Sequence, residues 1–271
     1  PLQGMYDNTN FPYIVPLVPT DTLGTYLRAL GYYTAYKGKW HLSDTATSCR
    51  DGSTVDALEG YGFSDYNSCG DYHGTPWAGY ARDEDVALDA AGWLGTRGVA
   101  LHESGTPFCL SVNFVTPHDI MFLDTDGTGA TQRAVLPVLG VPRSTLYQAT
   151  HGDVLPRTLT QSFTDRPSAH AETATLMDGV FGAIPTQRDD LWSVYVNYYL
   201  NCIRDVDRQV GVVLDALERA RLDGNTVIVL VSDHGELAGA HGLRQKGPNL
   251  YRENVNVPLV VSHPDARRAR E

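Results

Sequence analysis

Long apolar runs are missing from the sequence, so it predicts no transmembrane helix, which needs about 20 predominantly apolar residues. Positive charge is also scarce: Lys and Arg total 21 against 32 Asp and Glu, and the formal net charge is −11. This balance argues against a general nucleic-acid binder, which needs a basic face against the phosphate backbone. A small anionic substrate stays possible, because a few cations in a cleft hold an anion whatever the net charge.

Cysteine motifs are absent too. The four cysteines (Cys49, Cys69, Cys109 and Cys202) show no CxxC spacing and no neighbouring His cluster, which excludes zinc-site and thioredoxin-like patterns. Cys109 lies in an apolar strand-like run and Cys202 in an amphipathic helical run, so both are predicted to be buried free thiols. Free thiols favour a reducing compartment such as the cytoplasm, and a disulfide between Cys49 and Cys69 stays open.

Apolar strand-like segments alternate with amphipathic helical segments along the chain. Thr20 and Gly31 suit the N-terminal and C-terminal caps of the first helix. This alternation predicts an α/β fold with a mostly parallel sheet flanked by helices, in which ligands bind beyond the carboxyl ends of the strands. The predicted strands are 32–36, 108–114, 227–231 and 257–261, and the predicted helices are 21–30, 83–102 and 189–221.

An acidic residue and a histidine directly follow the third predicted strand. Asp233 offers hard oxygen and His234 a nitrogen, and Gly235 permits a tight turn, so the pair is suited to a divalent cation. The alternative is that Asp233 caps the next turn and His234 is an ordinary loop histidine. The residues alone leave these two interpretations equal.

Cationic and imidazole side chains follow the other strands. Lys39 suits an anionic oxygen and His41 a proton transfer near neutral pH, although a surface Lys and a His packed on Trp40 explain the same residues. His118 follows the strand at 108–114, and Lys246 lies near the C-terminus. Taken alone, His118 favours a structural role and Lys246 a surface position.

Residues 119–187 have weak periodicity and many Pro, Gly and Thr. A stretch of this length predicts either a functional excursion over a site or a poorly ordered insertion. Loops around a pocket usually set substrate identity, so this region is the predicted determinant of specificity. His241, in a Gly-rich stretch further on, is predicted to organise its loop and not to be a ligand.

Three segments together resemble the sulfatase family, in the family's order. They are GYYTAYKGKWHLS at 31–43, NFVTPHDI at 113–120 and SDHGELAGAHGLRQKGPNLYRENVNVPLVV at 232–261. The resemblance implies an alkaline phosphatase-like domain and a sulfuric ester hydrolase. It also changes the balance for Lys39, His41, His118, Lys246 and the Asp233–His234 pair towards functional roles.

The resemblance also implies roles for these residues. Asp233 and His234 are expected to bind a divalent metal, Ca²⁺ or in relatives Mg²⁺ or Mn²⁺, and the substrate is expected to be a small anionic sulfate ester. Lys39 and Lys246 would bind the sulfate oxygens, His118 would bind sulfate and protonate the leaving alcohol, and His41 would regenerate the resting aldehyde. All six are expected to converge at one cleft.

The sequence departs from the family pattern in three ways. It contains no Cys/Ser-x-Pro-x-Arg segment, the source of the formylglycine nucleophile, and lacks the first metal carboxylate pair and the C-terminal subdomain. It also begins at Pro1 without an initiator Met or a signal-like region. We therefore expect residues 1–271 to be part of a catalytic domain, truncated at both ends and inactive alone. A phosphonate monoester or phosphodiester hydrolase and a non-catalytic module are the alternatives.

Overall fold

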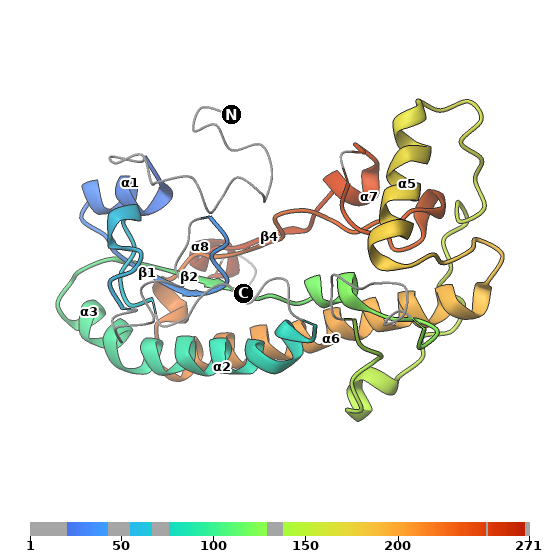
Figure 1. Cartoon of the computed structure of the whole chain (residues 1–271). Coiled ribbons are helices and arrows are strands. Elements are labelled where there is room, and N and C mark those ends of the chain that lie inside the picture. Colours follow the sequence, from blue (N-terminus) through green and yellow to red (C-terminus); the bar gives the residue numbers. More distant parts are fainter. Residues whose placement is uncertain (1–20, 43–54, 67–75, 129–137, 248, 269–271) are drawn as a thin grey trace. The chain divides into compact units, whose positions relative to one another are not determined.

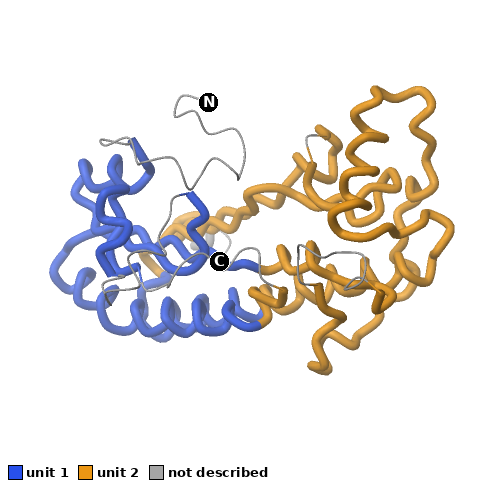
Figure 2. The backbone as a smooth tube through the Cα atoms, in the orientation of Figure 1, with its two compact units in different colours: residues 1–74, 81–115, 208–223 blue, residues 75–80, 116–207, 224–271 orange. Residues whose placement is uncertain are grey.

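A computed structural model describes residues 21–42, 55–66, 76–128, 138–247 and 249–268. The chain forms two compact units (Figure 2). Unit 1 comprises residues 1–74, 81–115 and 208–223, and unit 2 comprises 75–80, 116–207 and 224–271. The helices and strands (Figure 1) are α1 (Leu23–Ala29), β1 (Tyr33–Gly38), α2 (Ala78–Trp93), α3 (Val99–Glu103), β2 (Phe108–Asn113), α5 (Ser168–Phe181), α6 (Asp189–Arg219), β3 (Ile228–Val231), α7 (Arg252–Val255), β4 (Leu259–Ser262) and α8 (Pro264–Arg268).

A parallel strand pair lies at the centre of unit 1. β1 and β2 run in register from Tyr33 opposite Phe108 to Gly38 opposite Asn113, so both strands end at the same level. Parallel strands need a crossover connection, and this one contains α2 and α3, which are joined by a π-helical turn at Leu94–Gly98. The predicted α/β class is confirmed, with a helical crossover that begins earlier than expected.

The first helix is capped by a threonine pair. Thr22 is the N-cap: its hydroxyl accepts a hydrogen bond from the Thr25 backbone N–H, while the Thr22 N–H donates to the Thr25 hydroxyl. The predicted cap, Thr20, lies outside the described residues, and the helix begins at Leu23. Gly31 follows the helix with φ of 85°, which agrees with its predicted place at the C-terminal cap.

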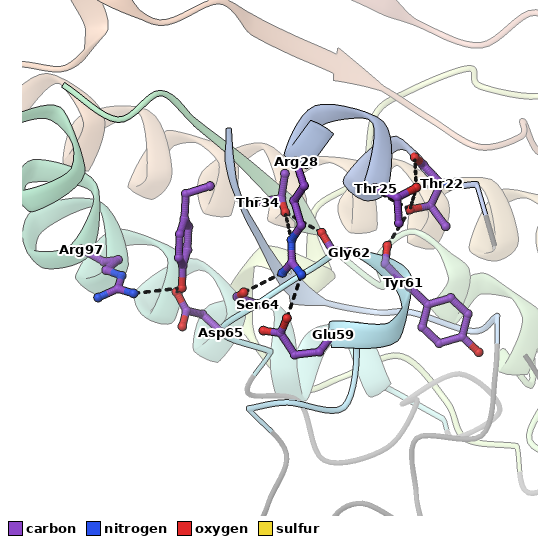
Figure 3. A network of polar contacts seen from close by, with 11 residues as sticks. Thr22, Thr25, Arg28, Thr34, Glu59, Tyr61, Gly62, Ser64, Asp65 and Arg97 are labelled. Atoms are coloured by element: carbon purple, nitrogen blue, oxygen red, sulfur yellow. Dashed lines mark hydrogen bonds and ion pairs between the residues drawn. The ribbon is translucent and has the colours of Figure 1, made fainter. Parts of the chain in front are cut away.

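One arginine connects three segments of unit 1 (Figure 3). From α1, the Arg28 guanidinium donates to the Thr34 hydroxyl at 3.0 Å, to the Glu59 carboxylate at 2.8 Å and to the Ser64 hydroxyl at 2.7 Å. The Thr34 hydroxyl in turn donates to the Gly62 carbonyl oxygen. This network fastens α1 and the 59–64 segment to β1.

An aromatic cluster completes the core of unit 1. Tyr36 packs edge-on against Trp40, with ring centroids 5.2 Å apart, and against Phe63 at 5.3 Å. Leu58 and Tyr66 are fully buried in the same cluster. Trp40 lies two residues after β1, so its burial fixes the path of the chain where the strand ends.

The second strand pair belongs to unit 2 and is antiparallel. β3 and β4 pair from Ile228 opposite Ser262 to Val231 opposite Leu259. The prediction of a mostly parallel sheet did not anticipate this direction, because a continuous apolar run has the same pattern in either orientation. β3 ends two residues before Asp233, as expected.

Much of the long stretch at 119–187 is packed structure. It contains α5, which the sequence did not predict, and it supplies five buried apolar residues to the core of unit 2. Where the structure describes it, this stretch is therefore packed against the core of unit 2. The core comprises Ile120, Leu123, Tyr147, Leu159 and Ile184 from this stretch, with Leu191, Trp192, Tyr195, Tyr198 and Cys202 from α6.

The described cysteines, Cys109 and Cys202, are both free, as predicted. Cys202 is buried, whereas Cys109 is only partly so. Cys49 and Cys69 lie outside the described residues. None of the helices in the described ranges combines the length and the apolar character that crossing a bilayer requires.

Candidate functional site

The Asp233–His234 pair forms a turn with its two side chains side by side. His234 Nδ1 lies 2.9 Å from the Gly235 carbonyl oxygen, which can only accept, so Nδ1 carries the proton and Nε2 is the basic nitrogen of the neutral ring. Asp233 Oδ2 lies 3.5 Å from His234 Nε2. Two ligands of one cation at about 2.1–2.5 Å stand roughly 3–3.5 Å apart, so the two atoms are spaced for a shared metal ion.

The glycine after this pair serves a different purpose from the predicted one. Gly235 does not adopt a positive φ, so it is not a left-handed turn residue. Instead, a Cβ at Gly235 would overlap the Glu253 carbonyl oxygen, and the Gly235 N–H donates to the Asn254 carbonyl oxygen at 2.9 Å. The close approach of two backbone segments requires glycine here and fixes the turn that carries Asp233 and His234.

The pair alone does not complete a metal site. In the part of the chain that the structure describes, no group of three or more His, Cys, Asp and Glu side chains is arranged to hold a metal ion. Calcium prefers six to eight oxygen ligands, and this pair supplies one carboxylate and one imidazole. Asp233 is largely exposed and His234 is partly exposed, which leaves room for further ligands. The residues present therefore fit one side of a divalent metal site.

Lys246 follows a loop that a single carboxylate organises. Glu236 Oε1 accepts hydrogen bonds from the Ala238 N–H at 3.1 Å, the Gln245 N–H at 2.7 Å and the Tyr195 hydroxyl at 3.2 Å. Burial raises the pKa of Glu236, while these hydrogen bonds and the positive charge of Lys246 lower it. The sequence did not identify Glu236, although its position shortly after the Asp-His pair was a signal.

The same segment is fastened to α5. The buried Arg244 guanidinium donates to the carbonyl oxygens of Met177 and Gly182 at the end of that helix, and lies 3.5 Å from the Asp178 carboxylate. Lys246, two residues later, is partly buried and so is not the fully solvated surface residue of the alternative interpretation. The stretch at 119–187 thus contacts the segment that carries a predicted sulfate ligand.

Lys39 and His41 stand directly after β1 in unit 1. Gly38 has φ of 88° and a Cβ there would overlap the Asn113 carbonyl oxygen, so only glycine fits. The Lys39 N–H then donates to that same oxygen at 2.8 Å, which extends the β1–β2 pairing by one residue. Lys39 and His41 are both partly buried, and His41 takes a left-handed backbone conformation with φ of 50°.

A neighbouring lysine that the sequence did not single out is the most buried cation of unit 1 in the described ranges. The Lys37 side chain is 3% exposed, and its Nζ lies 2.9 Å from the Asp89 carboxylate and 2.6 Å from the Asp65 carbonyl oxygen. Lys37 links β1 to α2. It is a structural lysine two residues before the predicted functional one.

His118 lies at the start of a short 3-10 helix, His118–Phe122, in unit 2. Its ring stacks on Phe122 with centroids 6.2 Å apart. The next residue, Asp119, is buried and its carboxylate accepts the backbone N–H groups of Gly79 and Tyr80 at 3.0 Å each. Asp119 therefore caps the beginning of α2 and holds the loop that carries His118.

His241 belongs to a separate contact network. Its ring stacks on Tyr251 with centroids 3.8 Å apart, and its two nitrogens face Gln161 and the Glu253 carboxylate, the latter at 3.5 Å. His170 from α5 also contacts the Tyr251 hydroxyl at 2.6 Å. These contacts agree with the predicted loop-organising role.

The predicted residues divide between the two units. Asp233, His234, Lys246 and His118 belong to unit 2, whereas Lys39 and His41 belong to unit 1. In each unit, the predicted residues lie on segments that follow a strand or, for Lys246, the buried Arg244 side chain. The convergence of all six residues at one cleft stays a prediction.

Comparison with known proteins identifies the family. A sequence profile of the Sulfatase family matches residues 2–271. The uncharacterized sulfatase YidJ of Escherichia coli K12 is 26% identical over 293 residues, which cover 98% of this chain and 52% of that protein. The chain thus spans about half the length of the curated relatives it matches most fully.

Solved structures share the fold. A 2-O GAG sulfatase matches with a TM-score of 0.62 at 20% identity, over 97% of this chain and 50% of that chain. The phosphonate monoester hydrolase of Agrobacterium radiobacter matches with a TM-score of 0.60 at 17% identity, over 92% of this chain and 53% of that chain. The fold is therefore the alkaline phosphatase-like fold of these enzymes, and the chain belongs to the sulfatase family.

Proposed function

We propose that residues 1–271 form part of the catalytic domain of a metal-dependent sulfuric ester hydrolase. One observation carries the proposal: the carboxylate of Asp233 and the basic nitrogen of His234 lie 3.5 Å apart at the end of a strand. The fold alone would not require this arrangement, because one fold hosts many functions. Membership of the sulfatase family over almost the whole chain supports the sulfate ester as the substrate class.

In this proposal, four side chains act on the substrate. Lys39 and Lys246 bind nonbridging sulfate oxygens, and each ammonium offsets the negative charge that develops there. His118 binds the sulfate group and donates a proton to the leaving alcohol oxygen. His41 acts as the base that restores the resting enzyme. Lys39 and Lys246 are both partly buried, and a cation that is shielded from water interacts more strongly with an anion.

The proposed metal ligands on this chain are Asp233 and His234. Their hard oxygen and imidazole nitrogen fit Ca²⁺ as the first choice, with Mg²⁺ or Mn²⁺ as alternatives. When bound, a divalent cation would stabilise negative charge on the reacting group. The nucleophile of the family, formylglycine, would come from a segment of the intact polypeptide that these 271 residues do not contain.

Contacts of α5 with the Lys246 segment suggest how specificity arises. Arg244 joins that segment to the end of α5, and the Gly247 backbone approaches Thr173 of the same helix. The 119–187 stretch therefore adjoins a proposed sulfate ligand. We propose that this stretch selects among small sulfate esters, as loops on a rigid scaffold commonly do.

The test measures turnover of an aryl sulfate and an aryl phosphonate by the intact polypeptide that carries these residues and a nucleophile segment. His118→Ala is expected to lower aryl sulfate turnover roughly 100-fold or more, the usual contribution of a general acid. The matched control is His102→Ala, which removes an exposed histidine at the end of α3 and should leave turnover unchanged.

Two outcomes would contradict the proposal. Faster turnover of the phosphonate than of the sulfate would favour the alternative of a phosphonate monoester hydrolase, the activity named for one structural relative. Equal sulfate turnover in the wild type and in His118→Ala would remove His118 from the reaction. The 271 residues by themselves should show no sulfatase activity, since no covalent intermediate can form without a nucleophile.

A further inference from the structure

The loop between the Asp233–His234 turn and Lys246 is closed by one carboxylate oxygen. Glu236 Oε1 accepts the N–H of Ala238 near the start of the loop and the N–H of Gln245 at its end. It also accepts the hydroxyl of Tyr195, a residue of α6 buried in the core of unit 2. Glu236 therefore adds to the backbone hydrogen bonds that close the loop, from the Leu237 N–H to the Gln245 carbonyl oxygen and from the Gly239 N–H to the Leu243 carbonyl oxygen, and it ties the loop to the core.

The two backbone donors are conformationally unusual. Ala238 has φ of 45° and Gln245 has φ of 68°, and both lie in the left-handed region that non-glycine residues rarely adopt. Residues in this region keep their conformation only where surrounding contacts hold them in it, and such residues cluster at functional sites. Here the N–H groups of both residues bond to the same carboxylate oxygen, so Glu236 stabilises both left-handed conformations together.

We propose that Glu236 is a positioning residue for Lys246. By holding Gln245 in its left-handed conformation, Glu236 sets the direction in which the chain enters Lys246 and so the place of the ammonium group. The inference rests on the proposed function of Lys246 as a sulfate ligand. Glu236 itself is given no contact with substrate, so its role is exerted through the backbone.

A second anchor limits the segment from the other side. Arg244 donates to the carbonyl oxygens of Met177 and Gly182, and its guanidinium is buried. With Arg244 fixed to α5 and Gln245 fixed to Glu236, the backbone just before Lys246 has little freedom left. Loss of the Glu236 contact should therefore release the segment locally and leave the rest of the unit folded.

The first arm of the test measures amide hydrogen exchange of the intact polypeptide. Glu236→Ala is expected to speed exchange across residues 237–247 at least tenfold, while the core segment 192–202 of α6 exchanges as in the wild type. Glu236→Gln keeps an oxygen that accepts both N–H groups and should retain most of the protection. The matched control is Glu218→Ala, an exposed glutamate of α6. Unchanged exchange at 237–247 in Glu236→Ala would overturn the inference.

The second arm measures the affinity for inorganic sulfate by calorimetry. A charge-assisted hydrogen bond is worth roughly a tenfold change in affinity, so Lys246→Met and Glu236→Ala should each weaken sulfate binding about tenfold. If Glu236 acts through Lys246, the double variant binds sulfate no more weakly than Lys246→Met. Additive effects in the double variant, or a normal affinity in Glu236→Ala, would refute the positioning role.

The two arms separate the inference from the proposed function. Equal sulfate affinity in the wild type and in Lys246→Met would contradict the proposed role of Lys246, and with it the positioning of a sulfate ligand. The exchange arm would still decide whether Glu236 closes the loop. Glu236→Gln guards against a fold defect, because rescue by this variant links the loss in Glu236→Ala to the missing acceptor.

Discussion

The buried ion pair between Lys37 and Asp89 predicts an asymmetry between its two partners. The Lys37 side chain is 3% exposed and the Asp89 side chain is 32% exposed. In Asp89→Ala, the Lys37 ammonium group stays inside the protein without the carboxylate and still donates to the Asp65 carbonyl oxygen. Removing one partner of a buried pair in this way costs about 3–5 kcal/mol of unfolding free energy.

Lys37→Met should cost much less. The substitution keeps most of the aliphatic volume and removes the buried charge, and the Asp89 carboxylate that stays behind reaches water. The main loss is the hydrogen bond to the Asp65 carbonyl oxygen, worth about 1–2 kcal/mol. For a chain of this size, about 2 °C of melting temperature corresponds to 1 kcal/mol, so we expect losses of about 6–10 °C for Asp89→Ala and about 2–4 °C for Lys37→Met.

The assay is thermal and urea unfolding followed by circular dichroism, with the double variant to close the cycle. The double variant should resemble Lys37→Met, because no buried charge is left unpaired. Asp85→Ala is the matched control on the same helix: its ion pair with Arg82 is exposed and 3.8 Å long, so its loss should cost less than about 0.5 kcal/mol. Equal losses for the two single variants, or a larger loss for Lys37→Met, would refute the reasoning.

Gly38→Ala should cost several times more unfolding free energy than Gly105→Ala in urea titrations. Both glycines have positive φ, but of these two only Gly38 would place its new Cβ against backbone atoms. Similar losses for the two variants would argue against the close approach of Gly38 to Asn113. Burial raises the pKa of Asp119, so the folded state keeps a proton that the unfolded state loses. The stability of the wild type should therefore fall relative to that of Asp119→Asn as pH rises from about 4 through the folded pKa. A stability difference that does not change with pH in urea titrations would contradict this. Added Ca²⁺ below millimolar concentration should leave the melting temperature of the 271-residue chain unchanged, because two ligands hold a hard cation weakly, and a clear stabilisation would show further ligands on this chain.

The elements with strong local patterns were predictable from sequence. α6 begins at the predicted Asp189 and ends two residues early, and β2 begins at the predicted Phe108, because long amphipathic or apolar periodicity needs no tertiary information. The positive φ of Gly38 was not predicted, although its neighbour Lys39 was singled out. The close approach of the Asn113 carbonyl oxygen is a contact between strands and cannot be seen within either one.

The features that escaped prediction depend on distant contacts. α2 begins at Ala78 and not at Asp83, because the carboxylate that caps it is Asp119, some forty residues along the chain. α5 has only Thr173 and Phe181 buried, too weak a stripe to recognise. The candidate site residues were predicted from the family pattern. The loop closure by Glu236 depends on an acceptor and a donor nine positions apart, a spacing that no periodicity encodes.

The glycine beside the Asp233–His234 pair separates two kinds of mutational failure. At Gly235, any side chain meets the Glu253 backbone, so substitutions should reduce how much folded protein a cell accumulates. One position earlier, His234 is partly exposed, so substitutions should leave abundance nearly intact while removing the proposed activity. In a library of single variants sorted separately for protein level and for activity, adjacent positions would therefore fall into opposite classes. Selection would then act on Gly235 through the amount of folded protein and on His234 through the activity of that protein.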